Sequence, residues 1–193
     1  RRGTVSPQVT FRHAYSLYQM GNYTGAAALF KTLASGDDIL AQQSAYYLGI
    51  STLQNKQLLD AKVAFRVAQK MDFDAQIKEE ATYNLIKILL DGKENAEAIS
   101  QLQAYLAQYP TGKYVDESNE LLSEVFFSTN NYQSAIDYIE KLAKRTPKIN
   151  EAYQKITYNQ GVMEFNAESY DKSIVYFDKS LSTPVDPQLR LQS

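Results

Sequence analysis

The feature that most constrains the fold of this chain is an internal repeat. A small residue is followed four positions later by a bulky apolar one at Ala26/Phe30, Ala61/Phe65, Ala98/Leu102, Ala135/Ile139 and Ser173/Phe177, in steps of 35, 37, 37 and 38 residues. Twelve residues before each small residue lies a second small or apolar position: Ala14, Gly49, Ile86, Ser123 and Gly161. The spacing is constant within units and varies between them. Each unit is therefore one fixed piece of structure, and insertions fall in the joining loops.

Within each unit, apolar residues recur with the period of a helix in two blocks, as in "AYYLGISTL" followed by "LLDAKVAFRVA". The few residues between the blocks allow only a tight antiparallel hairpin. The pattern predicts first helices at residues 7–20, 40–54, 75–91, 113–128 and 150–166. Second helices are predicted at 23–34, 57–70, 94–108, 131–144 and 169–181. Ser6 and Asp74 are expected to cap helix starts.

The motifs "YLGISTL" with "DAKVAF", and "NQGVMEF" with "KSIVYF", resemble the tetratricopeptide repeat. The tryptophan of that repeat is missing in every unit, and Ile86 and Ser123 replace its glycine in two of them. The resemblance implies an all-α fold, a right-handed superhelix of five hairpins over residues 7–184. The expected units are 7–40, 41–76, 77–113, 114–150 and 151–184 of a single solenoid, with 185–193 starting a further helix in what looks like a piece of a longer repeat protein.

Gly49 and Gly161 lie inside predicted helices, where a glycine costs about 1 kcal/mol relative to alanine. In the resembled hairpins this position faces the small residue of the second helix, here Ala61 or Ser173. We expect the two backbones to approach closely there. A larger side chain, as in Gly161→Leu, is predicted to overpack the contact.

Composition excludes several kinds of function. Lys and Arg number 20 and Asp and Glu 22, a net charge of -2, so the basic excess needed for nucleic-acid binding is missing. The chain has no cysteine, which excludes disulfides and thiolate catalysis and argues against cysteine-ligated metals. No uncharged stretch is long enough for a membrane span. Tyrosine, by contrast, occurs 15 times, more than a core needs, so some tyrosines are expected on a binding surface.

Tetratricopeptide repeats bind partners in a groove lined by their first helices. Carried over position by position, the resemblance implies a groove that is aromatic and apolar, with acid in the middle. Its predicted residues are Phe11, Tyr15, Tyr18, Tyr46, Ile50, Tyr83, Lys87, Glu117, Glu120, Glu124, Tyr158 and Val162. Such a groove suits a peptide or helix with apolar anchors and Lys or Arg. The alternative is that several of these residues pack between helices and that the carboxylates are a solvated face.

The sequence gives little support to catalysis, and we expect a protein with no enzymatic activity, no cofactor and no metal. The only histidine, His13, is expected to pack between the two helices of its hairpin, without the partners of a triad. The Lys and Asn clamp with which some cochaperones hold a carboxylate terminus is also missing from the matching positions. Binding of chaperone tails is therefore not expected.

Two functions of different classes remain open. The first is a scaffold that binds an unidentified protein or peptide in its groove. The second is a self-assembling or structural envelope module that stacks through its terminal repeats. An enzyme whose catalytic domain lies outside this sequence is a weaker third.

Part of the sequence resembles repeat proteins of the Gram-negative envelope. "LQAYLAQYPTGKYVDESNELLSEVFF" is similar to Tol-system accessory repeats, and "YDKSIVYFDKSL" with the tyrosine-rich first helices is similar to long tetratricopeptide proteins of the Bacteroidota. By analogy alone, this implies a periplasmic or cell-envelope location, with the cytoplasm as the alternative.

Overall fold

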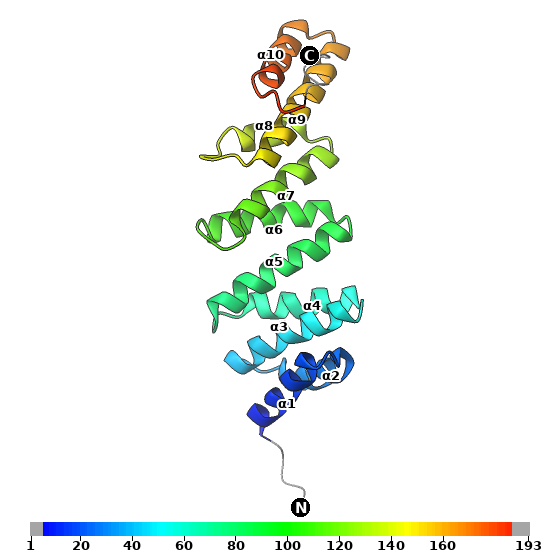
Figure 1. Ribbon diagram of the computed structural model, residues 1–193, viewed down its shortest axis with the longest axis vertical. Coiled ribbons are helices and arrows are strands. Elements are labelled where there is room, and N and C mark those ends of the chain that lie inside the picture. The colour runs from blue at the N-terminus through cyan, green and yellow to red at the C-terminus, as the bar shows by residue number, and fades with distance from the viewer. Residues whose placement is uncertain (1–5, 187–193) are drawn as a thin grey trace, which may run out of the picture. The chain divides into compact units, whose positions relative to one another are not determined.

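The computed structural model describes residues 6–186, which form ten α-helices and no strand (Figure 1). In chain order the helices are α1 (Pro7–Gln19), α2 (Tyr23–Leu33), α3 (Ile39–Gln54), α4 (Leu58–Lys70), α5 (Ala75–Asp91), α6 (Asn95–Gln108), α7 (Val115–Ser128), α8 (Tyr132–Ile139), α9 (Pro147–Asn166) and α10 (Tyr170–Leu181). The predicted all-α class is confirmed. Of the residues 185–193 that were expected to start a further helix, Val185 and Asp186 are not helical and the rest lie outside the described residues.

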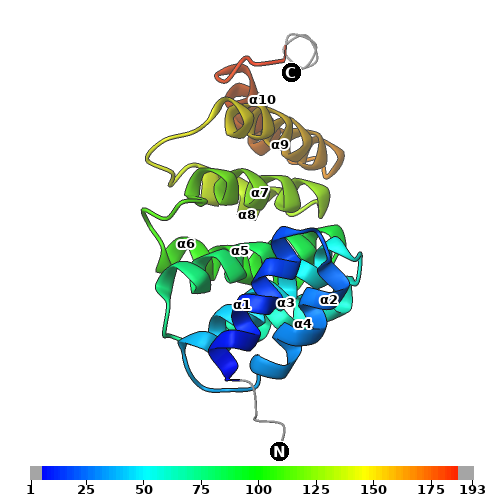
Figure 2. The same ribbon diagram turned by 60° about the horizontal axis from the view of Figure 1, so that its bottom comes forward.

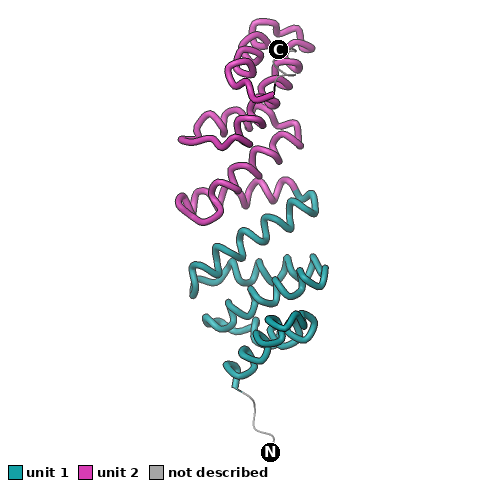
Figure 3. Tube along the Cα trace, in the orientation of Figure 1, with its two compact units in different colours: residues 1–94 teal, residues 95–193 magenta. Residues whose placement is uncertain are grey.

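The chain divides into two compact units, residues 1–94 with α1 to α5 and residues 95–193 with α6 to α10 (Figure 3). In unit 1, α1 packs against α2 and α3 against α4, while the first helices α1, α3 and α5 contact one another in sequence (Figure 2). In unit 2, α7 packs against α8 and α9 against α10, and α7 contacts α9. First helices therefore form one layer and second helices another within each unit.

The turns that join paired helices are built alike. Each has a left-handed residue at the same repeat position, with φ between 55° and 75°: Gly21, Lys56, Lys93, Asn130 and Glu168. The amide of the next residue donates to the carbonyl five residues back, as Gln57 N does to Thr52 O at 2.9 Å and Ser169 N to Glu164 O at 2.9 Å. This is the Schellman arrangement that ends helices. Only the first turn has the glycine that it favours.

Helix starts follow the predicted caps. The Ser6 hydroxyl accepts from Val9 N, and the Asp74 carboxylate accepts from Gln76 N and Ile77 N at 3.0 and 3.1 Å. Most helix ends lie within two residues of the prediction. The exceptions are the end of α8 and the start of α9.

The predicted second helix at 131–144 is wrong at its end, because α8 stops at Ile139. Thr146 is extended, as a residue before proline must be, and it caps α9 with Pro147 as the first helical residue. Helix α9 thus begins three residues earlier than the predicted residue 150. The loop that connects α8 to α9 therefore has to begin earlier, which shortens α8. The Arg145 side chain donates to the Ile139 carbonyl at 3.2 Å and satisfies the shortened end.

The glycine contacts are as predicted in kind. A Cβ built on Gly49 would lie 2.7 Å from the Phe65 ring, and one on Gly161 would lie 2.8 Å from the Phe177 ring. The Ser173 hydroxyl also donates to the Gly161 carbonyl at 2.9 Å. The space above each glycine is therefore filled by the phenylalanine of the paired helix. In the fourth repeat the glycine is replaced by the larger Ser123, and the phenylalanine by the smaller Ile139.

Two buried glutamines fix the path out of a hairpin. The Gln42 amide donates to Met71 O at 2.8 Å, and its oxygen accepts from Asp74 N at 2.7 Å. Gln154 does the same further on, accepting from Asp186 N at 2.6 Å and donating to Asp186 O at 3.1 Å. Each pairing satisfies buried backbone groups where the chain leaves a second helix.

Among the described helices, none has the length and apolar character needed to cross a membrane.

Candidate functional site

The first-helix layer of unit 1 is dominated by aromatic rings that surround Tyr47 of α3. The Tyr47 ring lies 5.2 Å from Tyr15 and 5.4 Å from Tyr18, and it stacks on Phe30 at 5.6 Å, centroid to centroid. Phe11 meets the same ring edge-on at 6.1 Å. These spacings are those of favourable aromatic pairs. We call this group the Tyr47 cluster.

The Tyr47 cluster borders a surface pocket of about 200 Å³ between α1, α3 and α5. Its walls are Phe11, Tyr15, Gln43, Tyr47 and Ile77. Tyr15 is 37% exposed, while Phe11 and Tyr47 are half-buried. The pocket therefore offers fixed aromatic walls with one ring still accessible to a ligand.

Burial raises the pKa of the Tyr47 phenol to about 12, and the neighbouring Tyr15 hydroxyl adds to the effect by its charge and by a hydrogen bond. Burial, followed by the charges of Tyr23 and Tyr15, also raises the pKa of Tyr18. Both hydroxyls stay neutral at physiological pH. They can hydrogen-bond to a ligand but do not act as bases there.

Tyr47 was missed by the sequence reasoning. The family's groove positions select Tyr46, the preceding residue, whose ring lies 5.3 Å from Tyr47 and 6.0 Å from Phe65. Tyr46 and Tyr47 adjoin on a helix and point about 100° apart, so they reach different neighbours. The run of two tyrosines was the available signal.

The other predicted residues of unit 1 have mixed surroundings. Tyr18 is half-buried within the Tyr47 cluster and Ile50 is half-buried on α3. Tyr83 on α5 is only 5% exposed, so its ring is packing, while Lys87 is exposed with its ammonium 5.7 Å from the centre of that ring. That the accessible residues among these bind a partner stays a prediction.

His13 corrects one expectation. The structure places it on the exposed side of α1 and not between the helices of its hairpin. The buried stripe of α1 passes through Ala14 with Phe11, Leu17 and Tyr18 packed beside it. His13 lies off that stripe, because neighbouring residues of a helix point about 100° apart.

The predicted acidic residues lie in unit 2. Glu120 and Glu124 of α7 both face Lys148 of α9, each with a carboxylate oxygen 3.5 Å from its ammonium. The Thr146 hydroxyl also donates to Glu120 at 2.6 Å. The charges of Glu124 and Glu120 raise the pKa of Lys148. This acid is thus already engaged within the unit.

The remaining predicted residues of unit 2 are Glu117, exposed on α7, and Tyr158 and Val162, both half-buried on α9. The Tyr158 ring lies 5.7 Å from Phe177 of α10, so it contributes to the packing of its own hairpin. Within residues 6–186, no group of three or more His, Asp or Glu side chains is placed to hold a metal ion.

Comparison with known proteins adds a family and a fold. Residues 11–75 match the tetratricopeptide repeat family. Among solved structures, MamA from residue 41 to its end, from Desulfovibrio magneticus RS-1, is similar with 16% identity over 92% of this chain and 94% of that chain, at a TM-score of 0.56. A tetratricopeptide repeat protein from Parabacteroides merdae ATCC 43184 has 14% identity over 91% of this chain and 66% of its own, at 0.62.

A third similar structure is YrrB, described as a tetratricopeptide protein with an unusual peptide-binding site. It shares 17% identity over 95% of this chain and 89% of its own, at a TM-score of 0.55. No curated protein sequence matches the chain.

Residues 11–75 match the tetratricopeptide repeat family by sequence, and the described residues have the fold of solved tetratricopeptide repeat proteins. The fold is that of α-solenoid scaffolds for protein–protein interaction, which are in general non-catalytic.

Proposed function

We propose that this protein is a non-catalytic interaction scaffold, and that the first-helix layer of unit 1 binds a peptide or helix of a partner protein. The observation that carries the proposal is the pocket between α1, α3 and α5, walled by the Tyr47 cluster. Tyrosine is enriched in binding hot spots because it offers a large, rigid apolar surface with a polar tip.

The size of the pocket supports a peptide over a small molecule. At about 200 Å³ it lies below the range of about 300 to 1,000 Å³ usual for small-molecule sites. It suits one apolar side chain projecting from a longer ligand. Helical ligands in grooves bind by such anchors, one or two turns apart.

The anchors are expected to contact unit 1 rather than the acid of unit 2. Glu120 and Glu124 already face Lys148, so a basic ligand would have to displace that lysine. Exposed ion pairs of this kind contribute little, and exchange of one lysine for another gains little. Apolar contact with Tyr15 and Phe11 has no such competitor within the pocket.

The peptide-binding site named for YrrB supports the proposal by analogy of fold. At 17% identity the analogy extends to the kind of ligand and to no particular residue.

A random peptide library selected on the immobilised protein tests the proposal. Selected peptides should bind Tyr15→Ala about tenfold more weakly than the wild type, as expected for loss of a hot-spot ring. Tyr170→Ala is the matched control, because Tyr170 is 54% exposed on α10 and lies outside the pocket. Failure to select any peptide, or equal loss in both variants, would overturn the proposal.

Self-assembly remains the second candidate, because one observation favours it. Helices α9 and α10 expose Met163, Phe165, Ile174 and Val175, each more than half accessible. Such a group of large apolar residues on one hairpin is a common mark of an interface. Light scattering after size-exclusion chromatography discriminates: a monomer at all concentrations removes this candidate, and a dimer lost in Ile174→Glu supports it.

The periplasmic or envelope location stays a prediction from sequence resemblance. Fusion to a reporter active only outside the cytoplasm would test it in the parent organism.

A further inference from the structure

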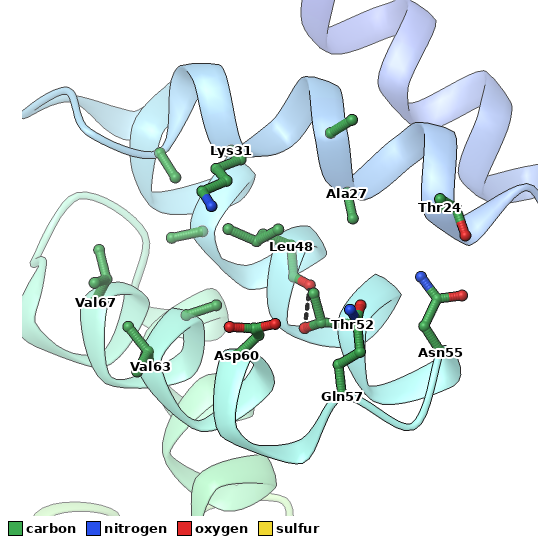
Figure 4. A pocket seen from close by; sticks show the side chains of 14 residues that line it. Thr24, Ala27, Lys31, Leu48, Thr52, Asn55, Gln57, Asp60, Val63 and Val67 are labelled. Atoms are coloured by element: carbon green, nitrogen blue, oxygen red, sulfur yellow. Dashed lines mark hydrogen bonds between the residues drawn. The ribbon is translucent and has the colours of Figure 1, made fainter.

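A larger pocket, of about 400 Å³, lies between the second helices α2 and α4 of unit 1, with α3 as its floor (Figure 4). Its lining is mainly small and apolar: Ala27 and Ala28 from α2, Ala34 directly after α2, Ala45 and Leu48 from α3, and Val63, Ala64 and Val67 from α4. Polar groups stand around it, among them Lys31, Thr24 and Asp60. It shares no residue with the pocket of the Tyr47 cluster.

The matching place in unit 2, between α8 and α10, is bridged by side chains. The Tyr176 hydroxyl of α10 donates to the Gln133 side chain of α8 at 2.6 Å. One turn further on, the Lys179 ammonium donates to the Glu140 carboxylate at 2.7 Å. The second helices of the fourth and fifth repeats are thus joined across their gap.

The repeat register shows why the first gap is open. Where α10 has Tyr176 and Lys179, α4 has Ala64 and Val67. Where α8 has Gln133 and Glu140, α2 has Thr24 and Lys31. Both bridges are therefore missing from unit 1.

The wall formed by α2 differs in the same direction. Ile136 of α8 is 1% exposed, and Ala27, which lines the pocket, stands at its repeat position in α2. The pocket coincides with two exchanges of a large side chain for alanine, at Ala27 and Ala64.

Charge gives the pocket a preference. Lys31 is exposed, and no residue between 6 and 186 forms an ion pair with it. It occupies the place of Glu140, which meets a lysine across the gap, so the complementary group for Lys31 is a carboxylate. Asp60, the acid of the lining, lies in the first turn of α4, where the helix N-terminus stabilises its charge.

We propose that this pocket is a second binding site, for a segment of a partner protein that presents an aromatic side chain together with a carboxylate. The ring occupies the space that Tyr176 takes in unit 2, against Ala64 and Leu48. The carboxylate pairs with Lys31. The site is independent of the Tyr47 cluster, so the protein can hold two segments on different sides of α3.

Three alanine-rich helical model peptides probe the site directly. One carries Tyr with Glu a turn away, the second Tyr with Lys, and the third Ala with Glu. By fluorescence anisotropy, the wild type should bind the Tyr/Glu peptide about tenfold more tightly than either of the others, since it alone supplies both the ring and the opposite charge.

Two variants locate the binding. Ala64→Tyr introduces the ring that fills the gap in unit 2 and should abolish binding. Lys31→Glu should reverse the preference toward the Tyr/Lys peptide, whereas Lys70→Glu, an exposed lysine of α4 outside the pocket, should leave the Tyr/Glu preference unchanged. The charge reversal remains decisive if Ala64→Tyr fails to fold, because Lys31 is on the surface.

Binding in Tyr15→Ala should equal that of the wild type, which separates this site from the first-helix pocket. Absence of binding by every model peptide, equal binding of the Tyr/Glu and Tyr/Lys peptides, or undiminished binding by a folded Ala64→Tyr would overturn the proposal. So would a dimer that dissociates in Ala64→Tyr, because the occupant would then be a second copy of this chain.

Discussion

In the first-helix layers, the same repeat positions carry side chains of different kinds in the two units. In unit 1 these positions carry Phe11 and Tyr15 beside an open pocket. In unit 2 they carry Glu120 and Glu124, which face Lys148 of their own unit. The gaps between second helices differ likewise, open at α2 and α4 and bridged at α8 and α10. At these positions the side chains of unit 1 leave pockets open, whereas those of unit 2 pair with one another.

The difference lies in side chains, because both units have the same frame. Gly49 meets Phe65 in unit 1 as Gly161 meets Phe177 in unit 2. In both units the turn after each first helix has a residue with positive φ at the same repeat position. A repeat protein can thus change its binding surfaces one position at a time and leave its helix packing intact.

The largest expected effect tests the shared frame. Gly49→Leu and Gly161→Leu should each lower the free energy of unfolding by about 3 kcal/mol, since even the first added carbon lies well inside contact distance of a phenylalanine ring. Urea unfolding measures both. The double variant Gly161→Ala/Phe177→Leu is the control, and it should lose much less stability than Gly161→Leu. An unchanged urea midpoint in Gly49→Leu or in Gly161→Leu would show that the two frames are not alike.

The next effect separates the structural rings of unit 1 from the accessible one. Tyr47→Ala should cost about 2 kcal/mol, because that ring contacts Phe30 and four further aromatic side chains. Tyr15→Ala should cost about 1 kcal/mol or less, since the ring is partly exposed. Thermal unfolding of the two variants decides. Equal losses would mean that Tyr15 is core and not a binding residue.

A smaller effect tests the common turns. Lys56→Gly in unit 1 and Glu168→Gly in unit 2 should each raise stability by up to about 1 kcal/mol, because both residues have positive φ, at 61° and 60°. Gly21→Ala should do the reverse, with φ of 75° and no neighbour within 4 Å of the added carbon. Melting curves that move together in the two glycine variants support equivalent turns, and opposite shifts would break the comparison.

The smallest effect concerns the bridge in unit 2. Burial raises the pKa of Glu140, but hydrogen bonds from Lys179 and Tyr153, with the charges of Lys179 and Arg145, outweigh it and lower that pKa below 4.5. A lowered native pKa means stability that is fully present above pH 4.5 and is lost as pH falls through the native value. Glu140→Gln should therefore flatten the acid limb of stability against pH. If stability falls with acid pH equally steeply in Glu140→Gln and in the wild type, the bridge does not contribute to stability.

Much of the fold could be predicted because it depends on local spacing. The turn positions, the Ser6 and Asp74 caps and the glycine contacts follow from residues close in sequence or at one repeat distance. The end of α8 could not, because it depends on how Thr146 and Pro147 start the next helix.

The candidate site could be predicted only in outline. The family's groove positions include Tyr15 and Phe11, which line the pocket and whose role in binding stays a prediction. They passed over Tyr47, whose role depends on five neighbouring rings. They also placed Glu120 and Glu124 in the groove as its acid. The pairing of these residues with Lys148 could not be foreseen, because it joins the two first helices α7 and α9. The pocket between α2 and α4 is lined by small residues. A small residue does not indicate a pocket by itself, only by comparison with Tyr176 and Ile136 at the matching repeat positions.

The most direct test of the account is a titration of ¹⁵N-labelled protein with a peptide selected on it, followed by amide chemical shifts. The largest shifts should fall on α1, α3 and α5 around Tyr15, Gln43 and Ile77, and Tyr15→Ala should need about tenfold more peptide to reach them. Shifts centred on α7 and α9 around Glu120 and Lys148 would contradict it.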